Sequence, residues 1–342
     1  MDKIKQVIIW GYPITKTHTQ AFIHSGWYKA FSYLGYKTYW FEDEDHPIDF
    51  EYDYSLFIGE GSADNNIPIN STSVYCINFC INPEKYLNKN ARVIDIRLNV
   101  DSIIDFNYHY SLKDEKEKGN VERISDVSYY HKLTDNGGLK KWHHKPKKMN
   151  YEAIYTSWAT DLLPHEFDYS SIDCKKENAI YYIGTLAGSN SKNVRIFAEE
   201  AKKHGIAFKI SDPWKNPLSF EDCRKYMAQS IICPDIRGNG DISKILIGET
   251  GTCHKDIGYI PCRIFKAISY GCLGITNSRH VYELFDRKVI YSDDEKELFH
   301  LAMREKDNTN LIKEQMDIVK EKHTYINRVN DIITIVNKTQ IL

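Results

Sequence analysis

The feature that most constrains this chain is an alternation of short apolar runs with amphipathic stretches, which occurs twice along its 342 residues. In the first half, an amphipathic stretch predicts a helix over 27–34. Buried strands are predicted at 6–10, 37–41, 54–58, 74–81 and 92–96. Strands separated by helices or polar loops favour a parallel sheet covered by helices. The first half is therefore predicted to be an α/β unit.

A second alternation begins at residue 179 and has the same character. The predicted strands are 179–183, 206–210, 230–233, 273–276 and 289–291, and the predicted helices are 191–203, 220–228, 262–270 and 281–285, followed by a mostly helical tail from 295. Two successive α/β series predict two Rossmann-like domains that face a cleft. We expect the first domain to span 1–165, with a charged surface excursion near 112–150, and the second to span 166–342.

Composition narrows the class of protein. The formal net charge is -2, so the overall charge does not favour nucleic acid or an acidic membrane as the main partner. The N-terminal apolar run, 7–10, is too short for a signal peptide or a membrane span, which leads us to expect a soluble cytoplasmic protein without integral membrane association. The eight cysteines include no CxxC pair. We therefore predict neither a disulfide framework nor a metal site.

The segment 258–278, GYIPCRIFKAISYGCLGITNS, carries the strongest chemical pattern. A helix that begins here would direct unpaired N–H groups at a ligand, and a pyrophosphate suits such a position. Arg263 and Lys266 are three residues apart and share one helix face, so they could supply cations to a diphosphate without a metal. Asn277 or Ser278 would cap the following helix. The alternative is an ordinary crossover in which Arg263 and Lys266 face solvent.

The loop after the first strand, GYPITKTHTQAFIHSGW, lies where parallel α/β sheets place ligands. His18 is the candidate base for an acceptor hydroxyl, because histidine titrates near neutral pH. His24 lies closer to the predicted helix start, where packing is the competing explanation. Both histidines could instead be ordinary polar loop residues or helix caps.

The loop 234–254 follows another predicted strand and is rich in glycine, aspartate and threonine. Arg237, Lys244 and His254 in this loop could clamp phosphate and sugar, and Arg237 could hold a phosphate oxygen bidentately. A surface loop with solvated charges is the alternative. The string Asp235-Ile236-Arg237 lacks the second acid of a DxD motif, so no metal motif is predicted.

Two further segments, 140–148 and 158–165, could contribute to binding. The basic run from Lys140 to Lys148, KKWHHKPKK, could meet a nucleic acid or another anionic surface, although a solvated loop is the favoured interpretation. In 158–165, WATDLLPH, Trp158 is expected to anchor the connection between the domains rather than to line the cleft.

The pattern P-x-R-x-F-x-A-x-x-x-G from Pro261, followed by V-Y-E-L and V-I-Y-S-D-D-x-x-E-L, resembles the donor domain of GT-B glycosyltransferases. It is most similar to the group-1 type that includes the spore-maturation-like bacterial proteins, and H-T-Y-I-N-R at 323–328 resembles the tail of that group. The resemblance covers roughly 179–336.

This resemblance implies a nucleoside diphosphate sugar held between the domains. It implies donor contacts from the turn Gly184-Thr185, from the segment between Tyr259 and Lys266, which includes Pro261 and Arg263, and from Thr276, Asn277 and Ser278. Lys266 stands where many relatives carry a glutamate that binds the donor ribose. A protonated lysine cannot accept a hydrogen bond from a hydroxyl, so Glu283 and Asp256 are candidates for that role.

These patterns together predict a metal-independent glycosyltransferase without a separate cofactor. Its donor is expected to be a UDP- or GDP-sugar, and its acceptor a glycan or a modified nucleic acid base. Two alternatives share the fold, because fold does not fix function. They are a nucleotide-sugar epimerase and a binding protein that keeps nucleotide affinity without catalysis.

Overall fold

The computed structural model describes residues 4–13, 19–97, 104–105, 108–109, 151–186, 190–213, 215–238 and 260–337. The first half forms a six-stranded sheet in the order β2-β1-β3-β4-β5-β8, and every neighbouring pair in it is parallel. The strands are β1 (Gln6–Gly11), β2 (Thr38–Glu42), β3 (Ser55–Glu60), β4 (Val74–Asn78), β5 (Arg92–Arg97) and β8 (Glu152–Tyr155). The predicted parallel α/β sheet is confirmed.

Helix α1 (Thr19–Tyr33) covers one face of this sheet and begins eight residues before the predicted start at 27. Its buried positions include Phe22, Ile23, Trp27 and Phe31, which follow helical spacing. Gly26 and several residues of modest helix propensity hid that spacing in the sequence. His24 and its neighbours therefore lie inside the helix rather than in the loop before it.

The five strands described in the second half follow the order of the first five strands of the first sheet. The parallel pairs in the second half are β10 (Ala207–Ser211) with β9 (Ala179–Ile183), and β11 (Cys233–Asp235) with β12 (Gly274–Thr276), which also pairs with β13 (Ile290–Tyr291). The N–H of Ile231 donates to the carbonyl of Ala179 at 3.0 Å, which sets β11 beside β9. The strand predicted at 230–233 is shifted to 233–235 because Ser230 ends the preceding helix.

The helices of the second half agree with the predicted pattern to within one or two residues. They are α6 (Asn190–Lys203), α7 (Phe220–Gln229), α9 (Cys262–Ser269), α10 (Arg279–Leu284), α11 (Glu295–Glu305), α12 (Thr309–Lys322) and α13 (Tyr325–Val336). Shorter elements are α2 (Glu84–Leu87), the 3-10 turns Pro164–Glu166 and Tyr169–Asp173, and the antiparallel pair β6 (Ile104–Asp105) and β7 (Tyr108–His109).

Each sheet has one point at which the strand order reverses. In the first sheet it lies between β1 and β3, and in the second it lies between β9 and β11. Ligands of open α/β sheets bind outside the carboxyl ends of the strands at such points. Gly11 and Glu60 end the two strands at the first switch point. Gly184 and Asp235 mark the second.

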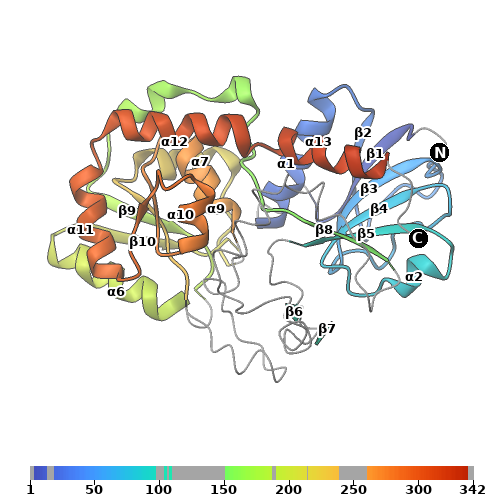
Figure 1. The fold of residues 1–342 in the computed structure, drawn as a ribbon, viewed down its shortest axis with the longest axis horizontal. Helices are drawn as coiled ribbons and strands as arrows, with labels where there is room; N and C mark the ends of the chain where they lie inside the picture. The colour runs from blue at the N-terminus through green and yellow to red at the C-terminus, as the bar shows by residue number, and fades with distance from the viewer. Residues whose placement is uncertain are drawn as a thin grey trace.

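Figure 1 shows the two halves as lobes side by side, with α13 lying against the lobe of the first half. Its Tyr325 packs on Trp27 of α1, with ring centroids 4.9 Å apart. Arg92 at the start of β5 donates to the carbonyl of Val336 at 2.8 Å and forms an ion pair with Glu152. The chain thus returns to its first half after building the second, and the division of the chain at 165/166 stays a prediction.

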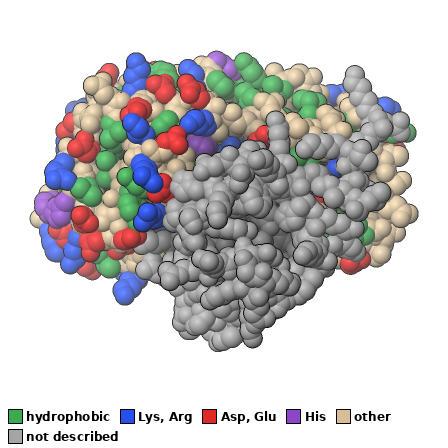
Figure 2. All heavy atoms as spheres, viewed as in Figure 1, with side chains coloured by type: hydrophobic (Ala, Val, Ile, Leu, Met, Phe, Trp, Pro, Cys, Tyr) green, Lys and Arg blue, Asp and Glu red, His purple; other side chains and the backbone are tan. Residues whose placement is uncertain are grey.

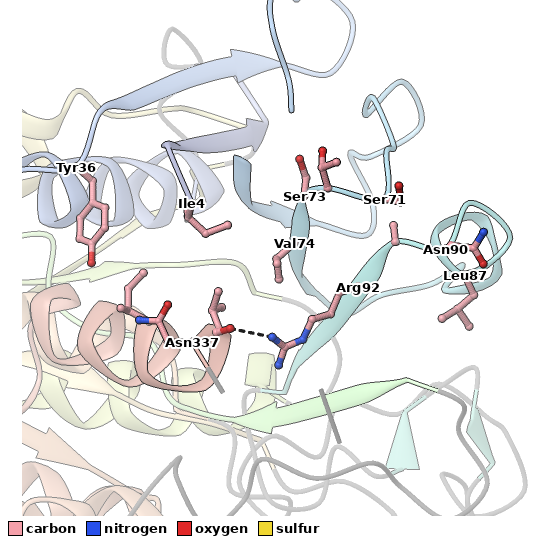
Figure 3. A pocket seen from close by; sticks show the side chains of 13 residues that line it. Ile4, Tyr36, Ser71, Ser73, Val74, Leu87, Asn90, Arg92 and Asn337 are labelled. Carbon is pink, nitrogen blue, oxygen red and sulfur yellow. Dashed lines mark hydrogen bonds between the residues drawn. The ribbon is translucent and has the colours of Figure 1, made fainter. Parts of the chain in front are cut away.

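A cavity of about 890 Å³ lies at the amino ends of β4 and β5. Figure 3 shows Arg92 directed toward the end of α13 beside this cavity, with Val74 and Ser73 on the neighbouring strand β4 and the loop before it. The cavity is at the edge of the sheet that α/β ligand sites do not use. We therefore expect the functional site at the other edge.

The surface agrees with the balanced composition. Figure 2 shows acidic and basic side chains interspersed over the visible part of the second half. Within the described ranges, the chain has no helix with the length and apolar character needed to cross a bilayer.

The close approach of α1 and α13 gives a testable prediction. A Cβ at Gly26 would lie 2.2 Å from the Tyr325 ring, which is buried and cannot move aside freely. We expect Gly26→Ala to lower the free energy of unfolding by about 1–3 kcal/mol, although alanine is the better helix former. Ser32→Ala, at an exposed position of the same helix, is the control. Equal stability of both variants in urea denaturation would contradict this packing.

Candidate functional site

Asp235, at the end of β11, is the centre of a buried polar cluster at the second switch point. Arg237 donates from Nη2 to both carboxylate oxygens, at 3.0 and 3.3 Å. The Thr276 hydroxyl, at the end of β12, donates to Oδ2 at 3.0 Å. Asp235 is 0% exposed and Arg237 is 2% exposed. A carboxylate this deeply buried is stable only with such charged and hydrogen-bonded partners.

Arg263 reaches the same carboxylate from the first turn of α9. Its Nε lies 4.0 Å from Asp235 Oδ1, and its side chain is 15% exposed. The guanidinium carbon is 4.4 Å from the centroid of the Tyr182 ring on β9. Burial lowers the pKa of Arg263, but Tyr182 and Asp235 outweigh this and raise it above its usual value. The group is therefore a fixed cation.

Two nitrogens of Arg263 are buried without a hydrogen bond. Among the residues that the structure describes, Nε and Nη1 have no acceptor within bonding geometry. An arginine has five N–H donors, and a buried donor without a hydrogen bond costs free energy of folding. An anion with several oxygens is the ligand that would satisfy them.

The turn Gly184-Thr185 lies directly against this guanidinium. A Cβ built on Gly184 would stand 3.1 Å from both the Arg263 carbon and its Nη1 atom, so any other residue here would require the guanidinium to shift by a few tenths of an ångström. The Thr185 hydroxyl donates to Asp212 at 3.2 Å. Glycine at this position keeps the space in front of Arg263 free of a side chain.

Two carboxamides fix the backbone on which Arg237 sits. Asn277 accepts from the Arg237 N–H at 2.9 Å and donates to its carbonyl at 2.8 Å. Asn193 of α6 donates to the same carbonyl at 2.9 Å. Asn277 also donates to Glu295 at 2.9 Å. The expected role of Asn277 as a helix cap is wrong, because its side chain forms hydrogen bonds with the backbone of Arg237 instead.

Pro261 and Ser278 occupy the N-cap positions of α9 and α10. Neither makes a side-chain capping bond, so the predicted cap by the Ser278 hydroxyl is also wrong. The Ser278 hydroxyl is buried and has no hydrogen bond among the described residues, while its N–H donates to Thr276. The first amides of α9 are free of intrahelical acceptors and lie on the residues next to Arg263.

Lys266 is 5% exposed and turns toward the first half of the chain. Its ammonium nitrogen lies 3.8 Å from the centroid of the Phe22 ring of α1. Burial lowers the pKa of Lys266, whereas Cys262, Cys223 and Asp161 raise it, with a net increase. The alternative in which Arg263 and Lys266 face solvent is therefore wrong.

Glu283, a candidate for ribose binding, is 6% exposed on α10. Its carboxylate accepts from Arg287 at 2.8 Å and lies 3.7 Å from Arg279. Part of its hydrogen-bonding capacity is thus already used within its own helix and the turn that follows. Its proposed contact with a ribose stays a prediction.

The remaining predicted positions lie outside the described residues. They are His18, Lys244, His254, Asp256, Tyr259 and the basic run from Lys140 to Lys148. Trp158 is 3% exposed, which agrees with its expected role as an anchor. In the described part of the chain, no three His, Cys, Asp or Glu side chains gather in a way that could hold a metal ion.

The sequence alone did not single out Asp235, Tyr182 or Asn193 as members of the site. Asp235 was noted only as an incomplete metal motif. Its place directly after a buried strand, with an arginine two residues later, was the available signal. Tyr182 resembled any core residue of an apolar run, and the contact of Asn193 depends on the fold.

Comparison with solved structures shows which fold this is. An α-glucosyltransferase in complex with UDP and a 13-mer DNA containing a central A:G mismatch matches with a TM-score of 0.52 and 11% identity, over 98% of this chain and 100% of that one. An α-glucosyltransferase in complex with UDP-glucose and DNA containing an abasic site matches with a TM-score of 0.51 and 10% identity, over 99% and 100%. A third α-glucosyltransferase structure, with UDP and a 13-mer DNA containing an HMU base, matches with a TM-score of 0.50 and 11% identity, over 97% and 99%.

Sequence comparison adds no family. No protein-family model matches the chain, and no curated protein sequence matches it. At 10–11% identity the structural likeness shows the fold alone. The chain therefore has the fold of these glucosyltransferases over nearly its whole length, and the resemblance to the spore-maturation-like group stays a prediction.

The contacts of the Asp235 carboxylate with two arginines lead to a testable prediction about stability. Asp235→Asn removes the negative charge that Arg237 and Arg263 contact while keeping the shape of the side chain. Breaking a buried ion pair from one side costs about 3–5 kcal/mol, and we expect a loss of that size in urea denaturation. Glu221→Gln, at an exposed carboxylate of α7, should change stability by less than about 0.5 kcal/mol. A similarly small effect of Asp235→Asn would show that the cluster is not electrostatically coupled.

Proposed function

We propose that the chain is a glycosyltransferase whose second half holds a nucleotide-sugar donor by its diphosphate. The observation that carries the proposal is Arg263, a cation with buried, unused donors in front of a glycine turn. It stands at a switch point, where α/β folds bind nucleotides. The fold shared with α-glucosyltransferases over nearly the full chain supports the same conclusion.

Arg263 would bind oxygens of the diphosphate, and the first amides of α9 would add donors beside it. Asp235 and Asn277 would hold the arginines in place. When the glycosidic bond breaks, negative charge grows on the leaving diphosphate. Fixed cations in a water-poor site stabilise that charge without having to reorganise. We propose that transfer proceeds in this way between two Rossmann-like domains of GT-B type, without a metal ion.

The donor we propose is a UDP-sugar, with a GDP-sugar as the alternative. The three similar structures are described as complexes with UDP or UDP-glucose, which favours uridine. Activity measurements distinguish the proposed transferase from the two alternatives, an epimerase and a non-catalytic binding protein. Only an epimerase would change the sugar of the donor without an acceptor, and a pure binder would show affinity without turnover.

Nucleotide binding is the first test. A ligand at about 100 times its dissociation constant stabilises the folded state by about 2.7 kcal/mol, so UDP should raise the unfolding temperature clearly. Arg263→Ala should abolish this shift, because it removes the diphosphate contact. Arg195→Ala, at an exposed position of α6, should leave it unchanged.

Two outcomes of the thermal-shift measurement would count against the proposal. An unaltered UDP shift in Arg263→Ala would exclude this residue from the site. Absence of any shift with UDP, GDP or their sugars would contradict the donor site as a whole.

A base in DNA is the acceptor that the comparisons favour. The three α-glucosyltransferase structures compared above are described as complexes that contain DNA. The run KKWHHKPKK from Lys140 to Lys148 offers five lysines and a tryptophan to a phosphate backbone. We therefore propose DNA as the acceptor, with a glycan as the alternative.

DNA binding gives a separate prediction. Neutralised phosphates release counterions, so log K should fall linearly with log salt at about 0.9 per phosphate contact. Changing the five lysines between Lys140 and Lys148 to glutamine should weaken DNA binding and reduce that slope, as measured by fluorescence anisotropy. The UDP thermal shift is the control and should not change. Salt-independent or undetectable DNA binding by the parent chain would favour a glycan acceptor.

A further inference from the structure

A buried acid, Glu60, lies at the switch point of the first sheet. Glu60 is the last residue of β3, and its neighbour across the parallel pair is Asn78, the last residue of β4. Both are 4% exposed. The acid therefore lies at the carboxyl end of a strand, where this fold places its ligands, and not in the interior of the sheet.

Strand alternation shows on which face Glu60 lies. Leu56 and Ile58 of β3 belong to the core on which α1 packs, and Phe57 belongs to the core of the opposite face. Glu60 continues the series of Leu56 and Ile58 and thus shares their face. The first turns of α1 lie on the same face and contact the second half, since Phe22 packs against Phe220 with centroids 4.2 Å apart. The acid is thus on the side of the sheet nearer to the second half.

The contacts of Glu60 are few. The Asn78 amide donates to Oε2 of Glu60 at 2.6 Å, and the other carboxyl oxygen makes no hydrogen bond among the described residues. The Asn78 Oδ1 atom is buried and also lacks a hydrogen-bond partner among these residues. A buried acid and an amide with unused capacity, side by side at a ligand edge, are suited to hold a hydroxyl group.

Two other buried acids of the first half have partners of their own. Asp64 pairs with Lys85 and accepts from Tyr86, and Asp95 accepts from the Cys80 N–H. On α1, the His24 ring lies against Tyr12 and Trp40, with centroids 6.0 and 5.8 Å away. None of these groups forms an ion pair with Glu60 in the described structure.

Burial of Glu60, which has no ion pair with a cation among the described residues, has a clear electrostatic consequence. It raises the pKa of Glu60 from 4.5 to about 8, against the smaller opposing effect of the Asn78 hydrogen bond. A carboxyl group that titrates close to neutral pH can both take and return a proton under working conditions. Ordinary surface carboxylates, ionised throughout this range, do so far less effectively.

We infer that Glu60, positioned by Asn78, is the residue that takes the proton from the acceptor hydroxyl. The inference rests on the proposed transferase function and adds a group on the acceptor side to it. As the acceptor oxygen forms its bond to the anomeric carbon, its proton passes to the Glu60 carboxylate. The bond from that carbon to the diphosphate oxygen breaks, and its electron pair leaves with the diphosphate. Glu60 then releases the proton to water.

The test uses water as the acceptor, so the natural acceptor need not be known. Release of UDP from UDP-glucose is followed from about pH 6 to about pH 9.5, or release of GDP from GDP-glucose if GDP is the nucleotide that binds. The parent rate should rise with pH to a plateau, with a midpoint close to pH 8. Glu60→Gln should lower the plateau rate by about 100-fold or more and remove the midpoint, while UDP affinity stays within twofold.

Asp95→Asn is the matched control, because it neutralises another buried acid of the same sheet whose side chain lies on the opposite face. It should keep the pH profile of the parent. A Glu60→Gln variant that keeps both the rate and the midpoint overturns the inference while leaving the proposed function intact. A parent chain that binds UDP but releases none at any pH also overturns it. A parent chain that binds no nucleotide contradicts the proposed function itself.

A stability measurement checks the state of Glu60 independently of catalysis. Because its folded pKa lies above its unfolded value, its protonation favours the folded state at low pH. That contribution is lost as pH rises from about 4.5 toward about 8. Glu60→Gln should therefore gain stability relative to the parent over this interval in urea denaturation. A constant difference between the two proteins across the interval would show that Glu60 titrates normally and would overturn the inference.

Discussion

The structure depends most on the burial of two guanidinium groups beside one carboxylate at the end of β11. Asp235 holds Arg237 directly and faces Arg263 at 4.0 Å, and all three are largely removed from water. Such an arrangement is stable only if its surroundings supply the missing hydrogen bonds. The Thr276 hydroxyl donates to the carboxylate from the neighbouring strand end, and Asn277 holds the backbone of Arg237 in place. The donors left over on Arg263 are suited to an anionic ligand, and Gly184 beside them carries no side chain that would contact the guanidinium.

The two sheets share a strand order, and this places two kinds of chemistry at equivalent positions. The switch point of the second sheet carries fixed positive charge, which suits the departure of a diphosphate. The switch point of the first sheet carries an acid of raised pKa, which suits proton transfer from a hydroxyl. The halves are joined by the cation–π contact between Lys266 and Phe22 and by the return of α13 to α1. Lys266, which replaces the glutamate expected from the resemblance, thus has a structural contact of its own.

Much of the fold could be predicted from the sequence, because strand periodicity and apolar runs are local signals. Most strands and helices of the second half lie within one or two residues of their predicted bounds, whereas β11 begins three residues late and β8 of the first half was not predicted. The start of α1 was misplaced because Gly26 sits in its middle, where only the packing of Tyr325 explains a glycine. The motif around Arg263 was found from its spacing, whereas the partnership with Asp235 and Tyr182 required the strand order. Glu60 was missed because a single acid after an apolar run has no local sign of burial, and its raised pKa arises from what the fold packs around it.

The most direct measurement of the central claim is a crystal structure of the chain grown with UDP-glucose. The account predicts a diphosphate oxygen within about 3.2 Å of a nitrogen of Arg263, with the phosphate in front of Gly184. A structure in which UDP-glucose is bound elsewhere, with Arg263 still lying over Tyr182 and no ligand atom in contact with it, would contradict the account.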